Sequence, residues 1–145
     1  MSLPLLDNLV RIGQIKAEPR NDAEVRRMLA MARTRLADAQ LASLSMEGRF
    51  TSSYNAAHAA ALAILRWHGY RSENRYIVFQ CLEHTLGWTA ARWRVLSIAH
   101  QKRNLAEYEG FLEIEAAALD ELSRVAGELI ADVQARVAAA SGGKP

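Results

Sequence analysis

The sequence predicts an all-α protein, an up-and-down bundle of four to five main helices in a single domain. Half of its 145 residues are hydrophobic but only 7% are aromatic, and alanine and leucine dominate, a balance typical of packed helices. Apolar residues also recur at helical spacing in successive segments, and the connections between these segments are short. We find no internal repeat or linker, so we expect one domain over 1–145 with its core at roughly 21–140.

The first two expected helices lie before residue 40. A short apolar segment at 5–16 predicts the first helix, and the pair Glu18-Pro19 stops it. Asn21 then caps the second helix, because Glu24 follows three residues later, as in a capping box. The apolar stripe of this second helix repeats with a clean helical period at Val25, Met28, Leu29, Ala32, Leu36 and Ala39.

The third expected helix is rich in alanine. A turn at 46–49 separates it from the second helix, and it runs from about 50 to 68, where Gly69 ends it before a loop at 70–74. Alanine residues occupy most of its circumference. Small side chains on every face suit a helix that its neighbours approach closely, so we place this helix in the middle of the bundle.

Three further helices complete the expected bundle. A short helix is expected at about 75–86; its Ile-Val-Phe run also suits a strand, but the neighbouring sequence offers no partner strand. Thr89 caps the next helix and Gly110 ends it. The last helix spans roughly 113–139, and we expect a frayed tail at 141–145.

Polar residues interrupt the apolar face of the helix that ends at Gly110. The apolar stripe of this helix comprises Trp93, Leu96 and Ala99. Arg103 follows at the same spacing, so a guanidinium that cannot lose its proton is expected to be at least partly buried, with a partner or a wet cleft. His100 and Asn104 lie on the same side of the helix, and Glu107 is the nearest candidate partner for the guanidinium. Such a cluster is either a structural network or a site.

Several kinds of site are excluded by the sequence. Cys81 is the only cysteine, so neither an internal disulfide nor a cysteine zinc cluster can form. The chain has no glycine-rich phosphate loop and no H-E-x-x-H zinc motif. No glutamate has a histidine three residues after it, as the ligands of a di-iron bundle require. We therefore expect no metal and no cofactor.

The formal net charge of +2 conceals an uneven distribution. Residues 1–106 hold 15 Lys and Arg against 8 Asp and Glu, whereas residues 107–145 hold 3 against 8. Ordinary solvated helix faces explain this difference; the alternative is a basic face that meets a phosphate-bearing partner. The residues of that face would be Arg66, Arg71, Arg75, Arg92, Arg94 and Lys102.

No segment predicts an association with a membrane. No apolar run approaches the roughly 20 residues that a membrane-spanning helix needs. The N-terminal sequence Met-Ser-Leu-Pro lacks the charged start and the long apolar stretch of a signal peptide. We therefore expect a cytoplasmic protein.

The order of these features resembles the HEPN superfamily of helical bundles. The stretch 53–60 is similar to the aromatic-Asn start of that family's alanine-rich helix, and 68–70 to the small-residue turn that ends it. The stretch 102–110, Lys-Arg-Asn-Leu-Ala-Glu-Tyr-Glu-Gly, resembles its late Arg-Asn-x-x-x-His type motif. The resemblance covers most of 21–140 and implies a HEPN-like bundle.

One departure from the family pattern bears on activity. In members that cleave RNA, the arginine acts with a histidine four to six residues after it, across a dimer interface. Here Arg103 and Asn104 match the motif, but no histidine follows His100 anywhere in the chain. Tyr108 stands near the expected place, yet with a reference pKa of about 10 it is a poor general acid or base. The resemblance therefore implies a catalytically silent member.

Three functional hypotheses follow. The first is a non-catalytic HEPN-like binding module, in which Arg103, Asn104 and Lys102 hold the phosphate of a nucleotide or RNA, or which acts with a nucleotidyltransferase-family partner. The second is a metal-independent ribonuclease toxin that uses His100 with Arg103. The third is a structural helical bundle. We also expect a homodimer, because the apolar third helix and the later Val95 and Ile98 leave apolar surface to cover.

Overall fold

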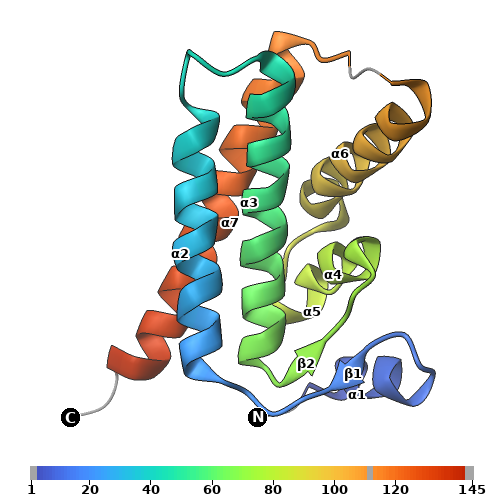
Figure 1. The fold of residues 1–145 in the computed structure, drawn as a ribbon. Coiled ribbons are helices and arrows are strands. Elements are labelled where there is room, and N and C mark those ends of the chain that lie inside the picture. The colour runs from blue at the N-terminus through green and yellow to red at the C-terminus, as the bar shows by residue number, and fades with distance from the viewer. Residues whose placement is uncertain (1–2, 111–112, 143–145) are drawn as a thin grey trace.

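The computed structural model describes residues 3–110 and 113–142, which are predominantly helical (Figure 1). This confirms the all-α class that the sequence predicts. The helices are α1 (Pro4–Arg11), α2 (Asp22–Ala39), α3 (Met46–Trp67), α4 (Arg75–Gln80), α5 (Leu82–Thr85), α6 (Ala90–Glu109) and α7 (Ala116–Gly142). Two short strands, β1 (Lys16–Ala17) and β2 (Tyr70–Arg71), pair with each other. No helix in this part of the chain combines the length and apolar character that crossing a membrane requires.

Helix α3 lies at the centre of the bundle. It packs most extensively against α2 and then against α7, and it also contacts α4, α5 and α6. Figure 1 shows α2 and α3 side by side and antiparallel, with α7 crossing behind them and α4 to α6 along the other side of α3. Every alanine within 56–63 is buried. These small side chains let the neighbouring helices approach closely, which confirms the central place predicted for this helix.

Helix α3 begins earlier than the sequence analysis predicts. The segment 46–49, expected as a turn, is the first turn of the helix. The Ser45 side chain accepts a hydrogen bond from the backbone nitrogen of Gly48 at 2.9 Å, so Ser45 is the N-cap. Gly48 therefore does not separate two helices, because the helix that Ser45 caps begins before it.

The N-terminal segment differs most from the prediction. Helix α1 ends at Arg11, and Gly13 follows with a left-handed φ of +78°, so the expected helix does not reach residue 16. Lys16 and Ala17 instead form β1, which pairs antiparallel with β2 in the segment expected as a loop. These strands could not be predicted from the sequence, because two residues are too few to show the alternation of apolar and polar residues that indicates a strand. Their pairing also joins segments that lie far apart in the sequence.

The later helices lie close to their predicted places. The helix expected at 75–86 is divided into α4 and α5 around Cys81, and it is not a strand. Thr89 occupies the N-cap position of α6 but makes no capping hydrogen bond through its side chain. Gly110 ends α6 with a φ of +78°, as predicted. Helix α7 continues to Gly142, so it includes the start of the expected frayed tail; 143–145 lie outside the described residues.

Among the described residues, one cation is fully enclosed in the core: Arg66 of α3, which is 1% exposed. Its Nε donates to a carboxylate oxygen of Glu24 at 2.7 Å. Its terminal nitrogens donate to the backbone carbonyls of Glu18 at 2.9 Å, Pro19 at 2.7 Å and Tyr70 at 3.4 Å. These bonds compensate the burial of the charge and tie the segment before α2, and strand β2, to the end of α3.

The basic face suggested by the charge distribution is only partly present. Arg66 lies in the core, and Arg71 binds the same two carboxylates as Arg66. Arg92 pairs with Glu128 at 3.0 Å. These three arginines are therefore neutralised within the fold. Of the residues named for that face, those without an ion pair in the described part of the chain are Arg75, Arg94 and Lys102.

Candidate functional site

An open polar cleft lies where α3, α6 and the start of α4 meet. Its volume is about 440 Å³, within the range of about 300–1,000 Å³ typical of small-molecule sites. The cleft brings together the three clustered residues of α6 with residues from two other parts of the chain. We call it the polar cleft, and it is lined by Tyr54, Glu73, Asn74, Arg75, His100, Arg103 and Asn104.

Tyr54 of α3 forms the floor of the polar cleft. Its side chain is completely buried, and its ring meets Phe79 of α4 edge-on, with the ring centroids 6.0 Å apart. The same ring stacks on His100 of α6 at a centroid distance of 6.0 Å. Because the ring is fully buried and contacts side chains of both α4 and α6, its position in the cleft is set by the packing of the bundle.

His100 is held on both ring nitrogens. The Tyr54 hydroxyl lies 2.7 Å from Nδ1, and the Asn104 amide nitrogen lies 3.2 Å from Nε2. A neutral imidazole has one donor and one acceptor nitrogen. With the amide donating to Nε2, the ring proton is on Nδ1 and is donated to the hydroxyl oxygen of Tyr54. Burial, together with the charges of Arg75 and Arg103, lowers the pKa of His100 below its usual 6.5, so the ring is neutral at pH 7.

Two guanidinium groups converge on the ring of Tyr54. The Cζ atoms of Arg75 and Arg103 each lie 5.4 Å from its centroid, a distance at which cations interact with aromatic rings. Arg75 also donates to the side-chain oxygen of Asn55 at 3.3 Å. Within the described residues, neither arginine forms an ion pair with a carboxylate, although Glu73 lines the same cleft. The cleft therefore carries more positive than negative charge.

The environment of Arg103 differs in one respect from the prediction. The side chain is partly buried, as its place on the apolar stripe indicates. Within the part of the chain that the structure describes, Arg103 does not form the expected bond to a carboxylate or carbonyl, and Glu107 is exposed. The guanidinium lies instead in the polar cleft near the Tyr54 ring. This is the wet cleft that a permanently charged group needs when it has no anionic partner.

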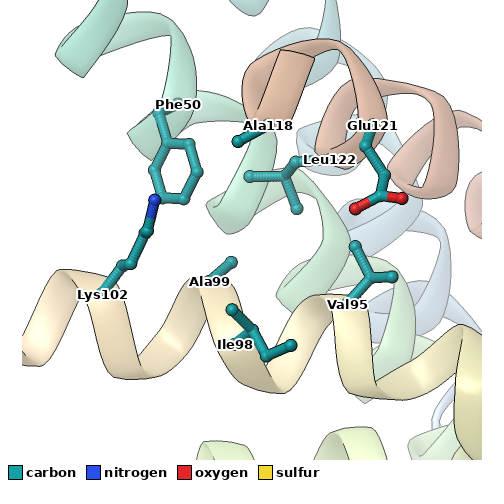
Figure 2. Close-up of a pocket in the computed structure, with 8 residues that line it drawn as sticks. All are labelled: Phe50, Val95, Ile98, Ala99, Lys102, Ala118, Glu121 and Leu122. Carbon is teal, nitrogen blue, oxygen red and sulfur yellow. The ribbon is translucent and has the colours of Figure 1, made fainter. Parts of the chain in front are cut away.

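Two of the residues proposed from the sequence lie elsewhere. Tyr108 is 94% exposed and does not line the polar cleft. Lys102 lies over a separate apolar hollow between α3, α6 and α7, where its chain points toward Phe50 (Figure 2). That hollow, of about 60 Å³, is far below the volume of an ordinary small-molecule site.

The residues of the polar cleft that come from outside α6 are not predicted by the sequence pattern. In the sequence, Tyr54 belongs to the aromatic-Asn motif and Arg75 to the uneven charge distribution, and no pattern points to Glu73 or Asn74. No local spacing connects these residues to His100, because the contact depends on how α3, α4 and α6 pack. One signal could have pointed to Arg75: no acidic residue lies three or four positions from it, so no partner on its own helix can pair with its charge.

Comparisons with known proteins do not place the chain in a family. No protein-family model matches it, and no curated protein or solved structure is significantly similar to it. The similarity to HEPN proteins therefore depends on the quoted motifs alone. Within residues 3–110 and 113–142, no group of three or more His, Cys, Asp and Glu side chains is arranged to hold a metal ion.

Proposed function

We propose that the polar cleft binds the phosphate group of a nucleotide or of RNA, and that the protein is a non-catalytic binding module with a HEPN-like fold. The observation that carries this proposal is the convergence of Arg75 and Arg103 on Tyr54 without a carboxylate partner. Elsewhere in the described chain, Arg66, Arg71 and Arg92 are all paired with carboxylates.

The chemistry of the cleft suits a phosphate. Guanidinium groups present planar, forked donors that match phosphate oxygens, and hydrogen bonds to charged groups are worth about 1.5–3 kcal/mol each. Burial and then the two cations lower the pKa of His100, and the cations also repel each other, so a bound anion would relieve this repulsion. Asn104 and Asn74, which line the same cleft, supply neutral donors beside the cations.

Both partners implied by the resemblance remain part of the proposal. One is a second copy of the chain, and the other is a nucleotidyltransferase-family protein. The apolar circumference of α3 no longer supports a homodimer, because the other helices of the same chain cover it. The apolar side chains that remain for an interface on α6 are those of Ile98 and Leu105, which are more than half exposed.

The proposal is tested by titrating the protein with adenosine 5′-monophosphate and with a 5′-phosphorylated single-stranded RNA. We expect Arg75→Ala and Arg103→Ala each to weaken binding about tenfold or more, and added salt to weaken it further. Arg94→Ala is the matched control, because Arg94 is an exposed arginine of α6 that does not line the polar cleft. If neither probe binds, or if all three variants bind equally, the proposed function is wrong.

A ribonuclease activity is the second candidate, and one observation favours it. His100, Arg103 and Tyr54 lie together, and His100 is neutral at pH 7, as a general base must be. Binding is nevertheless the better supported function, because both ring nitrogens of His100 already have protein partners. Cleavage of a labelled RNA without metal, abolished by both His100→Ala and Arg103→Ala, would establish the ribonuclease instead.

A purely structural role predicts a different outcome. In that case the polar cluster serves only to fix how α3 and α6 pack, as buried polar groups do in some proteins. Arg103→Ala would then lower the free energy of unfolding, and neither nucleotide nor RNA would bind to the wild-type protein. Measuring stability and binding on the same variant separates this role from the proposed one.

A further inference from the structure

A second cleft, adjoining the polar cleft, lies between α2 and α3. It has a volume of about 330 Å³ and is lined mainly by residues of α2 and α3, which lie side by side (Figure 1). Arg75 lines both clefts, and its bond to Asn55, which also lines the second cleft, holds it at their boundary. We call this second cleft the α2–α3 groove. Its other lining residues are Met28, Met31, Arg35, His58, Ala59 and Leu62.

The walls of the α2–α3 groove carry apolar, adaptable side chains beside the two cations Arg35 and Arg75. Met28 and Met31 come from one face of α2, and Leu62 comes from the facing side of α3. Methionine side chains are flexible and polarizable, so they adapt to the shape of a ligand, and their sulfur atoms make favourable contacts with aromatic rings. Ala59 adds no bulk between these side chains, which leaves room for a planar group.

His58 supplies the groove with a polar edge. Its ring packs edge-to-face on Phe79, with the centroids 6.0 Å apart, and forms no hydrogen bond within the described residues. No fully buried side-chain nitrogen or oxygen in this part of the chain lacks a partner, so the unbonded ring nitrogens of His58, which lines the groove, are not fully enclosed. Burial, aided by Arg75 and His100, lowers the pKa of His58 to about 4. The neutral ring therefore offers one donor and one acceptor.

We propose that the α2–α3 groove binds the nucleobase of the same nucleotide whose phosphate lies in the polar cleft. The base would lie against Met31 and Leu62 with an edge on His58, and Arg75 would lie between base and phosphate. This inference rests on the proposed function and adds a subsite that selects a nucleotide over other phosphates. The nucleotide is either free or a unit of single-stranded RNA, because both present a base beside a phosphate.

The test compares three probes by calorimetric titration. Ribose 5-phosphate carries the phosphate without a base, adenosine 5′-monophosphate carries both, and a pentameric oligoadenylate presents the same unit within RNA. Burying a base commonly strengthens binding by a factor on the order of tenfold. We therefore expect adenosine 5′-monophosphate to bind about tenfold more tightly than ribose 5-phosphate. Tighter binding of the pentamer than of the mononucleotide would identify RNA as the source, and the reverse would identify the free nucleotide.

Variants of the groove separate this subsite from the phosphate site. Met31→Ala and His58→Leu should each reduce the preference for adenosine 5′-monophosphate and leave the affinity for ribose 5-phosphate unchanged. Met31 is 45% exposed, so its replacement does not threaten the fold. Met46→Ala is the matched control, because Met46 is 40% exposed and lies about 13 Å along α3 from Asn55.

Each outcome decides between the two proposals. If the two monophosphates bind wild type equally and Arg103→Ala weakens both, the phosphate site stands and the base subsite is refuted. If adenosine 5′-monophosphate binds, depends on Met31 and ignores Arg103, the groove binds bases but the proposed function fails. If the groove variants and Met46→Ala behave alike, the groove does not contact the base.

Discussion

Replacing Arg66 by alanine is expected to destabilise the protein more than replacing any surface arginine. Arg66 is enclosed in the core and makes one bond to the Glu24 carboxylate and three to backbone carbonyls. Alanine removes all of these donors at once and leaves a space where the guanidinium was. The three carbonyls and one side of the carboxylate then lose their partners in a place that water reaches poorly.

The size of the effect can be bounded from the same contacts. Removing one partner of a buried ion pair typically costs about 3–5 kcal/mol. Glu24 keeps its second partner, Arg71, and its side chain is 21% exposed, so the value is expected near the lower end, at about 3–4 kcal/mol. Lysine in place of Arg66 keeps the charge but not the forked donors, and should cost about 2 kcal/mol.

Urea unfolding followed by circular dichroism measures these differences directly. The midpoint should fall for Arg66→Ala, while the slope of the free energy against urea stays constant. Arg94→Ala, an exposed arginine without an ion pair in the described chain, should stay within about 0.5 kcal/mol of the wild type. If Arg66→Ala unfolds within about 1 kcal/mol of the wild type, the buried network does not contribute as its geometry implies.

Three further predictions concern titratable groups. The hydrogen bond from Arg66 is the main cause that lowers the pKa of Glu24 below 4.5. The ionised carboxylate therefore stabilises the fold fully above pH 4.5, and this contribution is lost as the pH falls through the lowered pKa. The free energies of unfolding of the wild type and of Glu24→Gln should therefore converge at acid pH. In an NMR titration, His100 should have a pKa below 6.5 that rises in Arg103→Ala, since one nearby cation is removed. Burial raises the pKa of Cys81 to about 12, so iodoacetamide should label it only after unfolding.

Signals carried by neighbouring residues predicted the helices well. The Asn21 side chain accepts a hydrogen bond from the Glu24 backbone nitrogen at 3.0 Å, as the capping-box spacing indicates. Gly110 ends α6 in the left-handed conformation that glycine adopts readily. The alanine content of α3 likewise indicated that other helices surround it. These features depend on a few adjacent residues and need no knowledge of the whole fold.

Contacts between distant residues were beyond the sequence analysis. Arg66 at the end of a helix has the pattern of a surface cation near the negative end of the helix dipole. Its burial depends on Glu24 and on carbonyls that lie more than 40 residues earlier, which the packing of α2 on α3 and the pairing of β1 with β2 bring close. For the same reason, the sequence predicts only part of the candidate site. His100 and Arg103 share a helix face, whereas Tyr54 and Arg75 come from other helices.

The end of α6 gives the polar cleft a property that the rigid core does not share. Beyond Arg103, residues 104, 105 and 107–109 are exposed, so these turns are held mainly by their own backbone hydrogen bonds. Short helical turns without tertiary packing open at small free-energy cost, and their amide hydrogens exchange quickly. Arg103 and Asn104 lie at the start of this segment, so local opening would dismantle one wall of the cleft while the bundle stays folded. A ligand that binds Arg103 and Asn104 stabilises the helical form of this segment, so the exchange of its amide hydrogens should slow when the ligand is bound.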